Sequence, residues 1–161
     1  MVSWRAVLPS DNAARALLHQ YVEARAAGFP AGANAYRRST PVDSDFTPPA
    51  GVFVLVEGEN LSGEPAEVGC GGVRRIADGP LGARYEVKHL WIQPHARGSG
   101  FGRSLMQELI RHCREMGATE VVLDTNTSLR EAGELYRSLG FVPIAPYNDN
   151  PNATTWLARK L

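Results

Sequence analysis

The sequence has little of what marks several classes of protein. Its two cysteines, Cys70 and Cys113, lie far apart and in no metal-ligand spacing, so we expect reduced thiols in the core of a cytoplasmic protein. The 17 Lys and Arg residues balance the 17 Asp and Glu residues, which argues against a nucleic-acid-binding surface. No apolar run is long enough to span a membrane. The N-terminus also lacks the pattern of a signal peptide.

What is present is ordinary for a globular chain. Of 161 residues, 43% are hydrophobic and 21% are charged. This length suits one domain with a substantial core, no segment repeats, and no linker-like stretch divides the chain. We therefore expect a single domain over residues 1–161.

The spacing of apolar residues predicts strands and helices in the order β-α-β-β-β-α-β-α-β-β. Before the second strand lies a loop rich in Pro and Gly, with a short helix near residues 33–38. We expect Ser10 to cap the first helix, and Ser128 and Glu131 to form a capping box at the third, which Gly140 ends. The expected strands are 4–8, 52–59, 66–76, 84–93, 120–125, 141–144 and 154–161, and the expected helices are 11–28, 101–116 and 128–139.

This order predicts a mixed α/β layer, because three antiparallel strands run into a strand–helix–strand–helix unit. A doubly wound sheet would instead alternate strands and helices from the start.

Three glycines stand between a strand-like run and a helix-like run, in the segment "RGSGFG" from Arg97 to Gly102. The first N–H groups of a helix have no acceptor within it, and glycines allow a ligand to approach the backbone closely. Such a loop suits phosphate oxygens, and Arg97 adds a cation at its rim. The spacing fits neither the dinucleotide fingerprint nor the Walker loop. On these residues alone, a turn that binds nothing remains the alternative.

Two segments together resemble the GNAT superfamily of N-acetyltransferases. The run "RGSGFG" is similar to its Arg/Gln-x-x-Gly-x-Gly/Ala signature, and "EAGELYRSLGFVPI" is similar to its Ala-x-x-Leu-Tyr-x-x-x-Gly-Phe segment. The resemblance implies a largely antiparallel sheet, flanked by helices, with a V-shaped splay between two central strands. It also implies that acetyl-CoA lies in that splay as co-substrate, and that no metal takes part.

The resemblance places the cofactor against strand 84–93, the glycine loop and the start of the third helix. Many members have Asn at the position of Leu129, and here Asn126 is the candidate for that contact. We expect Leu90, Trp91 and Ile92 to pair with the pantetheine arm through backbone groups, since their side chains belong to the core. The remaining candidates, for the pyrophosphate, are Arg97, Gly98, Ser99, Gly100, Phe101, Gly102 and Arg103.

The chemistry requires a proton acceptor for the amine and a donor for the departing thiolate. Glu86 is the candidate base, acting through water, with a salt bridge to Arg74 or Lys88 as its structural alternative. His89 is a rival base. Strict alternation would place Glu86 and Lys88 on one face with Leu90 and Ile92, although a bulge would shift this parity. The resemblance makes Tyr136 the candidate acid, with a core tyrosine as the alternative.

For the acceptor, we expect a small-molecule primary amine that attacks acetyl-CoA directly in a ternary complex. A non-catalytic acyl-CoA-binding sensor and an acetyltransferase of protein N-termini or lysines are the alternatives. The neutral net charge predicts no nucleic-acid partner, and the lack of a long apolar run predicts no membrane partner. We expect either a monomer or a homodimer. The candidate acceptor-binding residues are Tyr36, Tyr147, Asn148 and Asp149.

Overall fold

The computed structural model describes residues 2–161, in which seven strands form one sheet ordered β1-β2-β3-β4-β5-β7-β6. The predicted order of strands and helices is confirmed. The strands are β1 (Ser3–Ala6), β2 (Gly51–Glu59), β3 (Pro65–Gly79), β4 (Gly82–Ile92), β5 (Glu120–Thr125), β6 (Val142–Ile144) and β7 (Thr155–Lys160). The helices are α1 (Asn12–Ala27), α2 (Phe101–Glu115) and α3 (Arg130–Ser138), with single 3-10 turns η1 (Ala33–Ala35), η2 (Asp43–Phe46) and η3 (Pro94–Ala96).

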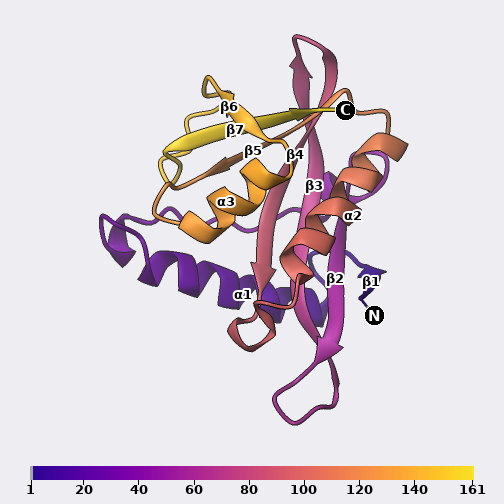
Figure 1. Ribbon diagram of the computed structural model, residues 1–161, viewed down its shortest axis with the longest axis vertical. Coiled ribbons are helices and arrows are strands. Elements are labelled where there is room, and N and C mark those ends of the chain that lie inside the picture. Colours follow the sequence, from indigo (N-terminus) through magenta and orange to yellow (C-terminus); the bar gives the residue numbers. More distant parts are fainter. Residues whose placement is uncertain (1) are drawn as a thin grey trace.

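The helices cover both faces of the sheet, with α2 and α3 on one face and α1 on the other (Figure 1). Strand β2 is buried on both sides and shows how the layers separate. Its Val52, Val54 and Val56 pack with residues of α2, whereas Phe53 and Leu55 pack with residues of α1. The two cores follow directly from the period of two along a strand.

Strands β4 and β5 form a parallel pair that ends early. Their register covers only Arg84↔Glu120, Tyr85↔Val121 and Glu86↔Val122, while the other pairs in the described sheet are antiparallel. Beyond Glu86 the two strands diverge, so the expected V-shaped splay is confirmed. One backbone edge of β4, from Val87 to Ile92, therefore has no strand partner.

A bulge at His89 changes which face the residues of β4 occupy. His89 has φ 58°, and the β3–β4 register shifts opposite it. As a result Val87 and Leu90 both face the α2 side, whereas Lys88 and Trp91 face the α1 side, opposite Gly72 and Cys70. The strict alternation that grouped Glu86 and Lys88 with Leu90 and Ile92 is therefore wrong, because the bulge inserts one residue.

The predicted helix starts also need correction. Asp11, not Ser10, caps α1, since its carboxylate accepts from the N–H groups of Ala13 and Ala14. The Ser10 hydroxyl instead donates to Asp43 at 2.6 Å.

At the third helix, Ser128 lies in the turn before α3, and its N–H donates to the Asn126 side chain. The N-cap of α3 is Leu129, so the predicted Ser128–Glu131 capping box is wrong. The short helix near 33–38 is a single turn over Ala33–Ala35, and η2 was not predicted.

The buried His89 side chain at the bulge predicts that the free energy of unfolding depends on pH. Burial, assisted by the charges of Lys88 and Arg74, lowers the pKa of His89 from 6.5 to about 3. Neutral His89 therefore contributes stability that is fully present above about pH 6.5 and lost as the pH falls toward about 3. In the variant His89→Asn the bulge should persist, because Asn tolerates a positive φ. Urea unfolding should show that the free energy of unfolding falls more steeply on acidification for wild type than for His89→Asn. Parallel pH curves would contradict this assignment.

Candidate active site

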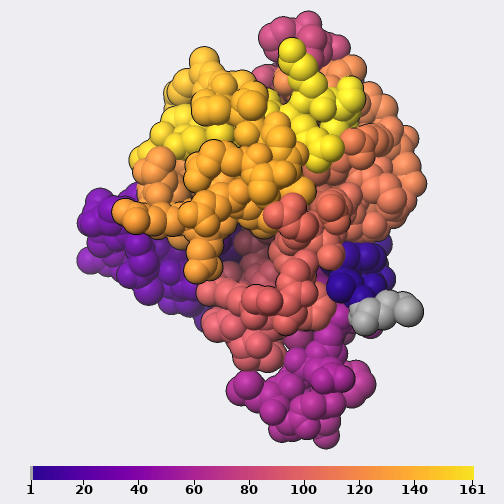
Figure 2. All heavy atoms as spheres, viewed as in Figure 1, coloured from indigo at the N-terminus to yellow at the C-terminus, as the bar shows by residue number. Residues whose placement is uncertain are grey.

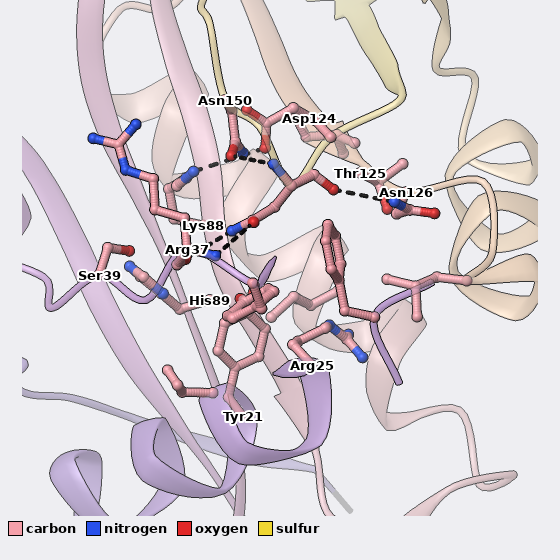
Figure 3. Close-up of a pocket in the computed structure, with 18 of the residues that line it drawn as sticks. Tyr21, Arg25, Arg37, Ser39, Lys88, His89, Asp124, Thr125, Asn126 and Asn150 are labelled. Atoms are coloured by element: carbon pink, nitrogen blue, oxygen red, sulfur yellow. Dashed lines mark hydrogen bonds and ion pairs between the residues drawn. The ribbon is translucent and has the colours of Figure 1, made fainter. Parts of the chain in front are cut away.

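A cavity of about 440 Å³ opens where β4 and β5 diverge. Tyr21 and Arg25 of α1 lie on one side of it, opposite Asp124, Thr125 and Asn126 at the end of β5 (Figure 3). In the space-filling view, the surface is hollowed between the atoms of the α3 segment and those that follow β4 (Figure 2). The cavity is lined by parts of β4 and β5, the turn before α3 and both segments predicted to bind the acceptor, whereas no residue of the glycine loop lines it.

The glycine loop presents a row of backbone N–H groups. Gly98 and Gly100 have φ of 85° and 83°, conformations that favour glycine. Gly100 is the N-cap of α2 and supplies no capping side chain. Within residues 2–161, no hydrogen-bond acceptor is found for the N–H groups of residues 98–103. Six adjacent donors at a helix start form a site suited to an anion such as a pyrophosphate.

The two arginines near this loop are already engaged. The Arg97 guanidinium lies 4.9 Å from the centre of the Trp91 ring, and its Nε donates to the Ile92 carbonyl at 2.9 Å. Arg103 donates to the Ser138 hydroxyl of α3 at 2.6 Å. Arg103 thereby ties α2 to α3, and its predicted contact with a phosphate stays a prediction.

The side chains of Leu90, Trp91 and Ile92, the part of β4 predicted to face the cofactor, are partly or fully buried. Leu90 and Ile92 pack against the α2 core, whereas Trp91 packs against α1 and donates to Gln20 at 3.2 Å. Their side chains are thus committed to the two cores, and the unpartnered backbone edge is what this segment offers to a ligand. The geometry suits strand-like pairing with an amide-bearing chain.

Glu86 lies in a buried polar network on the α1 side of the sheet. It is 1% exposed, and its carboxylate accepts from Arg74 Nε at 3.1 Å and from the Tyr147 hydroxyl at 2.7 Å. The Lys88 ammonium lies 4.0 Å away. Burial, followed by the charge of Glu86, raises the pKa of Tyr147 and keeps its phenol protonated. Tyr147, predicted to bind the acceptor, is thus a partner of Glu86.

A second buried carboxylate, which sequence analysis did not select, lines the cavity. Asp124 is 3.7 Å from Lys88 Nζ and accepts from the Asn148 amide at 2.7 Å. Asn148 also accepts from Trp156 Nε1 at 2.9 Å, so this predicted acceptor residue is held rigidly. The only signal in the sequence was an acidic residue at the end of an apolar strand.

Tyr136 and His89 both reach the cavity. The Tyr136 ring packs against Phe141, and its hydroxyl has no hydrogen-bond partner within residues 2–161. Burial raises the pKa of Tyr136 to about 12, so it remains a proton donor at neutral pH. His89 is neutral there, and its buried Nδ1 lacks a partner among the described residues. Its low pKa makes it a poor base.

The remaining predicted residues lie around the same cavity. Tyr36 packs edge-on against Phe29, and Asp149 lines the wall formed by the β6–β7 connection. Asn126 also lines it, but its amide donates to the Asn152 carbonyl at 3.2 Å and shapes the turn before α3. Sequence analysis missed Tyr21 and Arg25, which an amphipathic helix pattern does not distinguish from its other residues.

Two further properties concern the described part of the chain. Residues 2–161 hold no group of three His, Cys, Asp or Glu side chains placed to bind a metal ion. None of the helices there is long and apolar enough to cross a bilayer.

The amino-acid sequence is similar to those of known acetyltransferases. The family described as "Acetyltransferase (GNAT) family" matches residues 13–141. An uncharacterized N-acetyltransferase of Schizosaccharomyces pombe is 32% identical over 108 residues, which cover 66% of this chain and 61% of that protein. The chain thus spans about three fifths of the length of this curated relative.

Solved structures share the fold over nearly the whole chain. The NatC complex bound to Gag peptide and CoA contains a chain with TM-score 0.72 and 18% identity, covering 99% of this chain and 98% of that one. A phosphinothricin acetyltransferase from Sinorhizobium meliloti, in complex with acetyl-CoA, has TM-score 0.63 and 18% identity, covering 99% and 88%. With the splayed sheet and the glycine loop, the family match over most of the sequence shows that this chain belongs to the GNAT family of acetyltransferases.

Proposed function

We propose that the protein is an N-acetyltransferase, which transfers acetyl from acetyl-CoA to the primary amine of a small molecule in a ternary complex. The observation that carries this proposal is the splay of β4 from β5 beside six N–H groups without acceptors at the start of α2. Both features supply backbone donors to one extended, anionic thioester. The test is an assay of free CoA release over a panel of amines, with acetyl-CoA and propionyl-CoA. No release with any amine would contradict it.

The reaction balances without a further reactant. The neutral amine nitrogen forms a bond to the thioester carbonyl carbon, and the carbon–sulfur bond then breaks. The nitrogen loses one proton to a base, and the thiolate gains one proton from an acid. The products are an N-substituted acetamide and CoA thiol.

Two side chains take the proton roles in this proposal. Glu86 lies behind the cavity wall formed by Arg74 and Lys88, so the amine proton reaches it through water. Tyr136 lines the cavity with a hydroxyl that the protein leaves unpaired, which suits donation to the thiolate sulfur. The unpartnered edge of β4 near Leu90 supplies an N–H for the carbonyl oxygen.

A clasp between two segments that border the cavity favours a small acceptor over a peptide. The loop after α1 is joined to the β6–β7 connection, because Arg37 N–H donates to the Asn152 side chain at 2.9 Å and Asn152 donates to the Arg37 carbonyl at 2.7 Å. This clasp bridges the two segments that would otherwise border an open groove. The peptide in the NatC structure keeps a protein acceptor as the second candidate.

The glycine loop predicts a specific loss of cofactor affinity. Gly100→Val adds a side chain where the pyrophosphate meets backbone, so calorimetric titration should show acetyl-CoA affinity falling at least about tenfold, or ~1.4 kcal/mol. Gly117→Val is a matched control: Gly117 has φ 87° at the other end of α2, also with open space around it. Equal affinity in the two variants would contradict the assignment of this loop.

Replacement of Glu86 should slow the chemical step. Glu86→Gln removes the proton acceptor and should lower turnover about a hundredfold, the low end of general-base effects, while acetyl-CoA binding is retained. The measurement is the pH profile of turnover beside that of Asp124→Asn, which alters the carboxylate that lines the cavity. Wild-type rates for Glu86→Gln at every pH would leave Glu86 with a structural role only.

Tyr136→Phe should separate catalysis from stability. The hydroxyl has no hydrogen-bond partner among residues 2–161, so the melting temperature should change little. Turnover should fall at least about tenfold, because the hydrogen bond strengthens as charge builds on sulfur. Melting and turnover are measured on the same preparation. Normal turnover would make Tyr136 a packing residue and assign protonation to water.

A further inference from the structure

We propose that the acceptor amine carries a carboxylate, which Arg25 and Arg37 bind. This inference rests on the proposed function and narrows its substrate class. It follows from the balance of charge around the cavity, taken side chain by side chain.

The cavity is lined by four basic side chains, and two of them are neutralised by the protein itself. Lys88 lies 3.7 Å from Asp124 and 4.0 Å from Glu86. Arg74 lies 3.1 Å from Glu86 and 3.4 Å from Asp45. These two cations therefore already have anionic partners within the protein.

Arg25 and Arg37 are different, because neither has a carboxylate within 4.0 Å in the described chain. Arg25, in the last turn of α1, is half-buried, and its guanidinium lies over the face of the Tyr21 ring, 5.2 Å from its centre. The backbone of Arg37 is fixed by its two hydrogen bonds with Asn152. Its neighbour Arg38 shows the contrast: it pairs with Glu23 and does not line the cavity.

The position of Arg25 connects this charge to the reaction. Arg25 and Tyr136 line the same cavity. An anion bound by Arg25 would therefore share that cavity with the hydroxyl assigned to the thiolate. Arginine presents a planar fork of N–H donors that matches a carboxylate.

Around these charges, the wall of the cavity is aromatic. Tyr21, Phe29 and Tyr36 line it, and the ring centres of Phe29 and Tyr36 lie 5.6 Å apart in an edge-on arrangement. Asp149 is the acidic lining residue without an ion pair in the described chain, and its one negative charge is smaller than the two positive charges of Arg25 and Arg37. An amino acid, with an amine, a carboxylate and an apolar side chain, fits this combination.

The experiment compares each amino acid with its decarboxylated amine. L-phenylalanine is paired with 2-phenylethylamine, and L-leucine with 3-methylbutylamine, and kcat/KM is measured by CoA release. For wild type the acid should exceed its amine at least about tenfold, and Arg25→Gln or Arg37→Gln should lower this ratio at least about tenfold. Arg38→Gln, the matched control outside the cavity, should keep the wild-type ratio.

The outcomes separate this inference from the proposed function. Turnover of the amines with no preference for the acids overturns the inference and leaves the acetyltransferase proposal standing. If no compound releases CoA, the proposed function is contradicted, and binding decides the inference. CoA-saturated protein is then titrated calorimetrically with N-acetyl-L-phenylalanine and with N-acetyl-2-phenylethylamine. Tighter binding of the acid, lost in Arg25→Gln and kept in Arg38→Gln, supports it, and equal binding overturns it.

Discussion

The early end of the β4–β5 pairing is the constraint on which the site depends. A parallel pair that stops at Glu86 and Val122 leaves one edge of β4 without hydrogen-bond partners inside the sheet. Backbone N–H and C=O groups require partners, so such an edge is stable only beside solvent or a ligand. The bulge at His89 lies at this point and turns Leu90 toward one core and Trp91 toward the other. The chain thereby holds an open edge between two well-packed layers.

The buried charges near the splay also have partners within the protein. Glu86 and Asp124 are buried, and each is held by a cation and a hydrogen-bond donor: Arg74 and Tyr147 for one, Lys88 and Asn148 for the other. Buried charges without partners would be strongly unfavourable. Of the arginines that line the cavity without such partners, Arg37 is exposed and Arg25 is half-buried, so neither charge is cut off from solvent.

Much of the fold could be predicted, because it depends on local pattern. The period of apolar residues located every strand and α-helix of the described chain, and Gly140 ended α3 with φ 88° as expected. The errors lie at helix starts, at the 3-10 turns and at the bulge of β4. Ser10 and Asp11 are both good caps, and the choice fell to Asp11 because Asp43, distant in sequence, binds Ser10. Likewise, Asn126 binds the N–H of Ser128 and delays α3 to Arg130.

The sequence by itself determined the order of elements, the glycine loop at the start of α2 and the resemblance to one family, since each resides in contiguous residues. Only the tertiary structure decided that Tyr147 binds Glu86, that Asp124 pairs with Lys88, and that Arg25 and Arg37 share a cavity. Tyr147 and Glu86, for example, lie 61 positions apart in the sequence. Their contacts depend on how the sheet twists and where the bulge falls, which no local pattern of side chains encodes.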